Sequence, residues 1–217
     1  MNNPAAMGLL LGGKSHRMCE NKAMLPFDGV PAWKAVCAVL SQCGTVYLSV
    51  SEEAEFWDCP YPIVPDEIPN CGPMGGLTSL LKSCKEDRLF LCACDMPQMS
   101  ANFIHFLEDR LSRQSMNCEG IVVEDELGRL YPTAAIYKKS FLPRLEKAML
   151  EKQYRMSVPI REGNFCILPL QELPKQLEAA LLNVNTKSEY QSYCSLMNQN
   201  RNGGDQREPN PFDRHEK

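Results

Sequence analysis

Short apolar runs alternate along the chain with segments in which apolar residues recur every three or four positions. The short runs predict buried strands, because a strand that is covered on both faces is apolar throughout. They occupy residues 4–11, 46–50, 89–94, 120–123, 134–137 and 166–168. The longer spacing predicts helices over residues 33–40, 103–111 and 141–150. Strands that alternate with helices are typical of an α/β protein.

This order of elements predicts a three-layer, Rossmann-like fold, in which a mostly parallel sheet carries helices on both faces. The segment Asp125-Glu126-Leu127-Gly128 has the composition of a turn and lies between two predicted strands. We therefore expect at least one antiparallel strand. A single domain is expected over residues 1–197. Residues 198–217 are polar and poor in apolar side chains, which predicts a disordered tail.

Composition narrows the classes of protein to consider. The chain has 217 residues, of which 44% are hydrophobic, and a formal net charge of -4. This length suits one well-buried domain, and the negative charge argues against a nucleic-acid partner, which would need a basic face. No segment approaches the roughly 20 apolar residues of a membrane span, and the N-terminus lacks the basic region of a secretory signal. We therefore expect a cytoplasmic protein without a membrane segment.

The chain contains eleven cysteines, an odd number, and no Cys-x-x-Cys pair. In a cytoplasmic protein of this size, these cysteines are expected to be reduced thiols. Cys92 and Cys94 alternate in a predicted strand and so share one face. They keep a structural metal site open as an alternative to small buried apolar side chains.

The first predicted strand ends at Gly12-Gly13, and two cations, Arg17 and Lys22, follow. A glycine backbone can approach a phosphate closely because it has no Cβ, and the cations can offset the phosphate charge. The segment predicts a phosphate-binding loop. An ordinary junction between a strand and a turn is the alternative.

Residues 8–15 also satisfy the P-loop pattern of kinases and ATPases, with Asp95 as the magnesium-binding carboxylate. A P-loop requires a strand before its first glycine, yet only seven residues precede Gly8. The lysine and serine of a P-loop also begin a long helix, whereas Pro26 and Asp28-Gly29 indicate turns soon after. Both features oppose the P-loop interpretation.

Two carboxylates extend the predicted site. Asp66 follows Val64-Pro65 and precedes a glycine-rich loop at residues 70–76, whose backbone could approach a base or ribose. Asp95 follows a predicted strand that Pro97 terminates, so it lies at the edge where α/β folds bind ligands. One carboxylate suffices for Mg²⁺ when phosphates and waters complete its shell. A connecting turn and a helix cap are the alternative interpretations of these segments.

The motifs occur together and in a fixed order, in residues 10–18, 22–27, 65–66, 72–76, 94–97 and 183–186. With this set, the chain resembles the molybdenum cofactor guanylyltransferases, from about residue 7 to residue 190. The resemblance implies an α/β fold of the nucleotide-diphospho-sugar transferase type. It also implies a Mg²⁺-dependent nucleotidyltransferase that moves GMP from GTP to the phosphate of molybdenum-molybdopterin and releases pyrophosphate. Molybdoenzymes or cofactor-insertion proteins are candidate partners.

The resemblance further implies roles by position. The nucleotide-binding set consists of Leu10, Leu11, Gly12, Gly13, Lys22, Ser49, Asp66 and Asp95. The catalytic set consists of Lys22, Arg17 and Asp95, with the cations on the phosphates and Asp95 on Mg²⁺. No side-chain nucleophile is required, because the attacking phosphate oxygen already carries charge. Residues 130–133 and 154–156 are candidate pterin segments without an assigned role.

Two positions depart from the pattern of this family. Cys19 stands where the family usually has Gly, and Asn21 stands where it usually has Asp. Two alternatives therefore stay open. One is a cytidylyl or other nucleotidyltransferase of the same fold, and the other is a GTP-binding accessory protein with reduced turnover.

Overall fold

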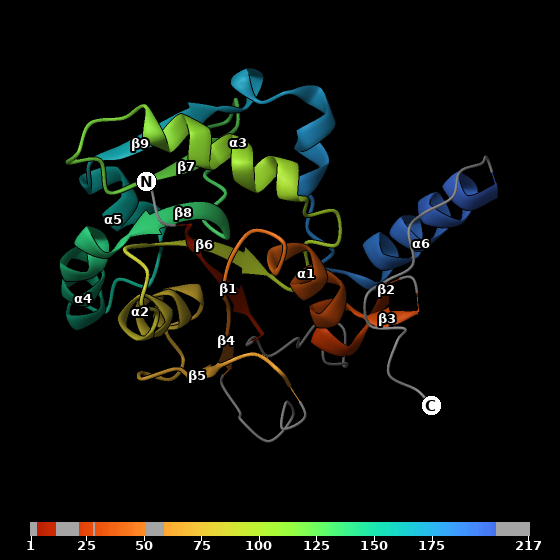
Figure 1. The fold of residues 1–217 in the computed structure, drawn as a ribbon, viewed down its shortest axis with the longest axis horizontal. Helices are drawn as coiled ribbons and strands as arrows, with labels where there is room; N and C mark the ends of the chain where they lie inside the picture. The colour runs from red at the N-terminus through yellow and green to blue at the C-terminus, as the bar shows by residue number, and fades with distance from the viewer. Residues whose placement is uncertain (1–3, 12–21, 28, 51–58, 203–217) are drawn as a thin grey trace.

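A seven-stranded sheet forms the centre of the protein (Figure 1). The computed structural model describes residues 4–11, 22–27, 29–50 and 59–202. The strands lie in the spatial order β5-β4-β1-β6-β8-β7-β9. Their bounds are Ala6–Leu10 for β1, Val46–Val50 for β4, Ile63–Pro65 for β5, Arg88–Ala93 for β6, Gly120–Glu124 for β7, Ala134–Lys138 for β8 and Phe165–Pro169 for β9. Strands β2 (Pro26–Phe27) and β3 (Val30–Pro31) form a separate hairpin.

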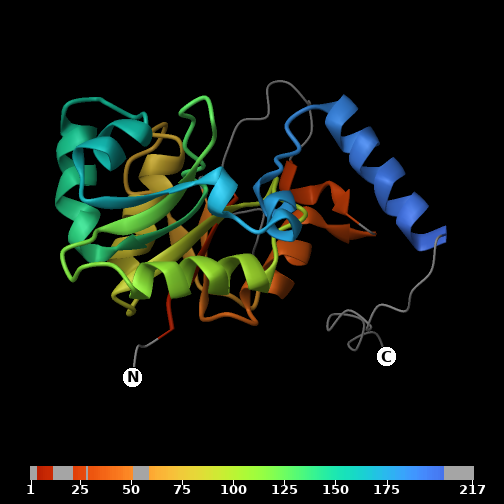
Figure 2. The same cartoon turned by 90° about the horizontal axis from the view of Figure 1, so that it is seen from above.

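Helices cover both faces of this sheet, as Figures 1 and 2 show. On one face lie α1 (Ala32–Leu40) and α3 (Ala101–Ser112), and on the other lie α2 (Pro73–Ser83), α4 (Leu142–Leu150) and α5 (Ser157–Glu162). Helix α6 (Lys187–Asn202) lies beside the β2–β3 hairpin. Short 3-10 helices occupy Lys22–Met24 (η1), Lys139–Phe141 (η3), Leu170–Glu172 (η4) and Lys175–Leu181 (η5).

Strand β1 shows why the predicted strands are apolar throughout. Met7 and Leu9 pack in the core cluster that includes α1 and α3, whereas Ala6 and Leu10 pack in the cluster that includes α2. Successive side chains of a strand point to opposite faces, so a sheet between two helical layers needs apolar residues at every position. At Gly8, an added Cβ would lie 2.9 Å from Leu80 of α2, which shows how closely the helix packs.

Strand β8 is antiparallel to both of its neighbours, β6 and β7, whereas β1 is parallel to β4 and β6. The connection from β7 to β8 begins with the predicted turn. Asp125 Oδ1 accepts hydrogen bonds from the backbone N–H groups of Leu127 and Arg129, at 2.9 Å each, and Gly128 has a φ of 75°. The three-layer, mostly parallel fold and its antiparallel strand are thus confirmed.

The structure adds elements that the sequence pattern did not indicate, namely the three-residue β5, the β2–β3 hairpin, α5 and α6. Helix α6 continues to Asn202, so the first five residues of the predicted tail, 198–202, are helical. The rest of the predicted tail, residues 203–217, lies outside the described part of the chain, and the boundary at residue 197 stays a prediction. Within the described part, none of the helices combines the length and apolar character needed to span a membrane.

Candidate active site

Those predicted site residues that the structure describes lie at the edge of the sheet around β1, where the order of the strands reverses. From β1 the chain proceeds to β4 and β5 on one side, and it then returns to β6 on the other side of β1. In open α/β sheets, ligands bind outside the carboxyl ends of the strands at such a switch point. Asp95 follows β6, and Lys22 lies in η1, in the connection after β1.

Lys22 and Asp95 form an ion pair although 73 residues separate them in sequence. Lys22 Nζ lies 3.3 Å from Asp95 Oδ2, and the exposed fractions of the two side chains are 21% and 16%. A shorter hydrogen bond, 2.8 Å, joins Lys22 Nζ to Asn185 Oδ1. The ammonium group is therefore held between a carboxylate and an amide, with part of its surface still open to solvent.

The carboxylate of Asp95 is only partly satisfied. Its Oδ1 atom is buried and has no hydrogen-bond partner among the residues that the structure describes. Burial raises the pKa of Asp95 above its ordinary value of 3.8, and the charge of Lys22 opposes this increase. A buried oxygen without a partner costs free energy, so such an atom at a ligand-binding edge indicates a missing partner.

A divalent cation fits this oxygen. Mg²⁺ prefers oxygen ligands and commonly takes one or two carboxylates together with phosphate oxygens and waters. In the described part of the chain, no group of three His, Cys, Asp or Glu side chains is arranged to hold a metal by itself. Asp95 is therefore suited to a cation that arrives with a phosphate ligand, and less suited to a structural metal.

Asn185 was part of the predicted motif at residues 183–186 but had no predicted role. Its position follows from the backbone, because Val184 N–H donates a 2.8 Å hydrogen bond to the carbonyl of Asp95. This contact joins two segments that are distant in sequence, so the spacing of residues could not indicate it. The order of the motifs was the available signal, since it placed both segments in one family pattern.

Ser49 and Asp66 form a second polar pair along the same edge. Ser49, on β4, is 2% exposed and donates a 2.7 Å hydrogen bond from its hydroxyl to Asp66 Oδ1. Asp66 follows β5, and its backbone N–H donates to the Val50 carbonyl at 3.2 Å. Burial raises the pKa of Asp66, and the Ser49 hydroxyl partly lowers it again.

The glycine-rich segment brings α2 against this pair. A Cβ on Gly76 would lie 2.5 Å from both Ser49 Oγ and Leu10 Cδ2, so no larger residue fits without displacement. Gly72, the residue before α2, has a φ of 58°, and Asn70 also has a positive φ, 64°. These conformations are easiest for Gly and Asn. The glycines and Asn70 of this loop thus allow the chain to turn sharply into α2 and the helix to pack closely against Ser49.

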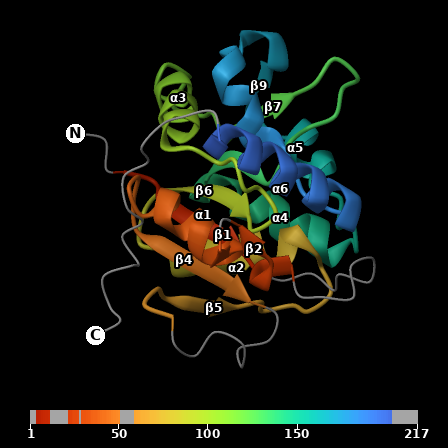
Figure 3. The ribbon, with the colours of Figure 1, turned by 90° about the vertical axis from the view of Figure 1, so that its right-hand side faces the viewer.

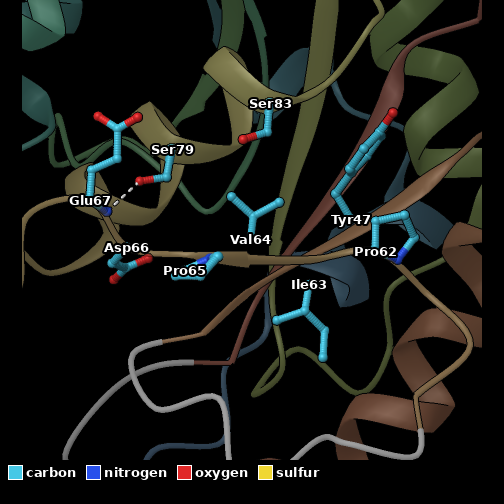
Figure 4. A pocket seen from close by; sticks show the side chains of 9 residues that line it. All are labelled: Tyr47, Pro62, Ile63, Val64, Pro65, Asp66, Glu67, Ser79 and Ser83. Atoms are coloured by element: carbon cyan, nitrogen blue, oxygen red, sulfur yellow. Dashed lines mark hydrogen bonds between the residues drawn. The ribbon is translucent and has the colours of Figure 1, made fainter.

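A cavity of about 510 Å³ adjoins Asp66, between the edge strand β5 and helix α2. Figure 4 shows Ser79 and Ser83 on α2 above Val64 of β5, with Asp66 at the end of the strand. The hydroxyl of Ser79 accepts a 2.9 Å hydrogen bond from the Glu67 N–H, which fixes the chain just after Asp66. The second carboxylate therefore stands at the rim of an open space.

Of the other predicted nucleotide-binding residues, two are described by the structure and two are not. Leu10 and Leu11 lie at the end of β1, where the Leu11 N–H donates to the Ser49 carbonyl at 2.9 Å and the Leu10 carbonyl accepts from Cys94 N–H at 3.3 Å. These two groups are thus engaged within the sheet, and contact of Leu10 and Leu11 with a nucleotide stays a prediction. The predicted residues Gly12, Gly13 and Arg17, and the atypical Cys19 and Asn21, lie outside the described residues.

The two candidate pterin segments lie in different places. Residues 130–133 precede β8, and Ala134 of β8 pairs with Cys92 near the end of β6, so this segment reaches the same edge as Asp95. Tyr154 instead contacts the Cys71 side chain, near the entry into α2. The structure therefore brings residues 130–133 to the carboxyl edge of β6 and places Tyr154 beside the glycine-rich loop.

The Cys92 and Cys94 side chains face the same core cluster, as their alternation predicted. Burial raises the pKa of the Cys94 thiol to about 12. In the described part of the chain, neither thiol belongs to a group of three side chains that could hold a metal ion. These two cysteines therefore act as small core side chains.

Comparison with known proteins agrees with this geometry. The family model of the MobA-like NTP transferase domain matches residues 8–163. This chain belongs to that family. Two relatives of this MobA-like chain carry the name probable molybdenum cofactor guanylyltransferase. The protein of Carboxydothermus hydrogenoformans is 27% identical over 88% of this chain and 95% of its own length, and that of Thermococcus kodakarensis is 28% identical over 87% and 93%.

Solved structures share the fold of this MobA-like domain. The molybdopterin-guanine dinucleotide biosynthesis protein A of Archaeoglobus fulgidus superposes with a TM-score of 0.77 at 19% identity, covering 89% of this chain and 99% of the other. A CMP:2-keto-3-deoxy-manno-octonic acid synthetase in complex with CTP gives a TM-score of 0.66 at 10% identity, covering 91% and 100%. The predicted nucleotidyltransferase fold type is therefore confirmed.

Proposed function

We propose that this protein transfers GMP from GTP to the terminal phosphate of molybdenum-molybdopterin, with release of pyrophosphate, in the cytoplasm. The observation that carries the proposal is the Lys22–Asp95–Asn185 cluster at the switch point of a MobA-like domain. The names of the relatives at 27% and 28% identity support the choice of GTP and of a molybdopterin acceptor.

The two polar pairs suit the two ends of a nucleotide. Asp66 and Asp95 follow strands that are three positions apart in the sheet, so about 14 Å of edge separates them. An extended nucleoside triphosphate can bridge such a span. Asp66, held by Ser49, would accept hydrogen bonds from the nucleoside, while Lys22 would lie against the phosphates.

The residues of the site stabilise charge and do not attack the substrate. The acceptor phosphate supplies the nucleophilic oxygen, so alignment and charge stabilisation are what the protein must provide. Lys22 donates hydrogen bonds to phosphate oxygens as negative charge grows on the departing pyrophosphate. Asp95, through its unpartnered Oδ1, would hold Mg²⁺, which supplies further positive charge when bound. Arg17 is proposed as a second phosphate cation.

Nucleotide selectivity is tested by thermal unfolding with GTP, CTP, ATP or UTP, each with and without Mg²⁺. A ligand at one hundred times its dissociation constant adds about 2.7 kcal/mol to the free energy of unfolding. We expect stabilisation by GTP that depends on Mg²⁺, and pyrophosphate release when molybdenum-molybdopterin is added. A preference for CTP would instead assign the protein to cytidylyl transfer. Binding of GTP without pyrophosphate release would assign it to an accessory role.

A further inference from the structure

The start of α6, together with the residues just before it, contacts the Lys22 segment at two points. Asn185, two residues before the helix begins, accepts the 2.8 Å hydrogen bond from Lys22 Nζ. Farther along the helix, the hydroxyl of Tyr190 donates a 2.7 Å hydrogen bond to the carbonyl of Pro26. The Lys22 side chain is thus attached to the residues just before α6, and the backbone four residues later is attached to the helix itself.

Ring packing reinforces this attachment. The Phe27 ring lies 5.0 Å from that of Tyr193 and 5.8 Å from that of Tyr190, between ring centroids. Together with Ala32 and Val184, these residues form a small core that is separate from the two clusters on the sheet. Figure 3 shows α6 just above β2, on the side of the molecule that faces the viewer. The contact is therefore a packed interface of its own.

Glu189 fixes the start of this helix. Its Oε2 atom accepts hydrogen bonds from the backbone N–H groups of Asn185 and Thr186, at 2.7 and 2.9 Å, and its own N–H donates to Thr186 Oγ1 at 3.2 Å. This reciprocal arrangement is a capping box, which sets the backbone at a helix N-terminus. Because the Asn185 N–H is one of the bonded groups, the cap also fixes the residue that holds Lys22.

We infer that Glu189 is a positioning residue, which acts through Asn185 to hold the Lys22 ammonium beside Asp95. Two contacts define the position of Asn185, namely the backbone bond from Val184 to Asp95 and the bonds to the Glu189 carboxylate. Glu189 is exposed, and its hydrogen bonds go to Asn185 and Thr186. The inference rests on the proposed function for its effect on catalysis, whereas the position of Lys22 can be tested without any substrate.

The test without substrate is competitive acetylation of lysines, read by mass spectrometry, with exposed Lys147 as the internal reference. In Glu189→Ala, we expect Lys22 to be labelled about fivefold faster than in the wild type, because the cap that holds its acceptor is lost. Glu189→Gln retains a side-chain acceptor and should restore most of the protection. Glu178→Ala, which removes a carboxylate paired with Lys175, is the matched control and should leave the labelling rate of Lys22 unchanged. Unchanged labelling of Lys22 in folded Glu189→Ala would overturn the inference.

The test with substrate is a double-mutant cycle on kcat/KM for GTP. Glu189→Ala should lower kcat/KM about fivefold in the wild-type background and less than about twofold in the Lys22→Ala background, since the two residues act together. A loss of equal size in both backgrounds would mean that Glu189 serves the fold alone and would overturn the inference. Asn185→Ala, which removes the amide oxygen that accepts the hydrogen bond from Lys22 Nζ, repeats the cycle if Glu189→Ala fails to fold. Absence of transfer in the wild type would reject the proposed function, while the labelling result would still decide the position of Lys22.

Discussion

Asp66 and Asp95 occupy similar places in the sheet but have different partners. Each follows a parallel strand at the carboxyl edge, and burial raises the pKa of each carboxyl group. Asp66 accepts a hydrogen bond from a neutral hydroxyl at 2.7 Å, whereas Asp95 faces an ammonium group at 3.3 Å and keeps Oδ1 without a partner among the described residues. The two aspartates thus have different surroundings, which suit them to different roles.

The difference shows that the neighbouring groups of each carboxylate determine its role in a nucleotide site. A carboxylate fixed by a hydroxyl is suited to hydrogen bonding with a neutral part of the ligand, which affects binding in the ground state and the transition state alike. A carboxylate beside a cation, with a free oxygen, is suited to the part of the ligand where charge changes. We therefore expect changes at Asp66 to alter mainly KM and changes at Asp95 to alter mainly kcat.

The largest effect is expected from Asp95→Asn. This variant keeps the shape of the side chain but removes the charge, so turnover should fall about a hundredfold or more, or about 3 kcal/mol in activation free energy. The measurement is steady-state pyrophosphate release at saturating GTP. Asp109→Asn, on the exposed ion pair with Arg113, is the matched control and should retain normal turnover. Near-normal turnover in folded Asp95→Asn would remove the basis for assigning the metal to this residue.

A smaller effect, and of a different kind, is expected from Ser49→Ala and Asp66→Asn. Ser49→Ala removes the hydroxyl that donates the 2.7 Å hydrogen bond to Asp66, and Asp66→Asn replaces the charged acceptor with a neutral amide. Loss of one charged hydrogen bond to the nucleoside should raise KM for GTP about tenfold and leave kcat within about twofold. The same kinetic assay supplies both parameters. If kcat fell as far as in Asp95→Asn, the proposed division between the two carboxylates would be wrong.

Sequence patterns anticipated the sheet better than they anticipated the surroundings of these carboxylates. The six predicted strands are present because each is a run of apolar residues, which is a local property of the sequence, and five of them are buried on both faces while the edge strand β9 is only partly buried. Strand β5 escaped notice because its three residues include Pro65 and lie at the edge of the sheet. Helix α6 escaped because its mean hydropathy is low and it packs through a few aromatic side chains.

The positions of Asp66 and Asp95 could be predicted because each follows a strand, and parallel strands end at one edge. The partners of these residues could not be predicted from spacing, since Lys22 and Asn185 approach Asp95 from segments 73 and 90 positions away. Such contacts depend on the path of the chain in three dimensions. Glu189 could have been recognised as a cap from the Thr-x-x-Glu pattern at residues 186–189, although its link to Lys22 could not.

The pH dependence of stability offers a further test at Asp66. Because its pKa is raised above 3.8, the folded protein binds this proton more tightly than the unfolded chain does. The contribution of Asp66 to stability is therefore full below pH 3.8 and is lost as pH rises from 3.8 through the raised pKa. Ser49→Ala removes the hydroxyl that lowers this pKa, so the loss should extend to higher pH, by about 1.4 kcal/mol for each unit of additional shift.

The measurement is the free energy of unfolding in urea across this pH range for the wild type, Ser49→Ala and Ser49→Ala/Asp66→Asn. We expect the additional loss in Ser49→Ala to disappear in the double variant, which has no titrating group at this position. A loss that persists without the carboxyl group would show that another residue titrates and would separate Ser49 from the electrostatics of Asp66.

The smallest effect is expected at Lys82, which marks the limit of the Asp66 region. Its Nζ lies 2.8 Å from Glu67 Oε2 and 3.0 Å from Glu146 Oε1, and all three side chains are exposed by a third or more. Exposed ion pairs contribute at most about 1 kcal/mol and weaken with salt, so Lys82→Ala should change the free energy of unfolding by less than that. Glu67 directly follows Asp66, but its carboxylate pairs with Lys82 at the surface. We therefore expect KM for GTP in Lys82→Ala to stay within about twofold of the wild-type value. A tenfold rise in KM, as in Ser49→Ala, would extend the nucleotide site from Asp66 along α2 to Lys82.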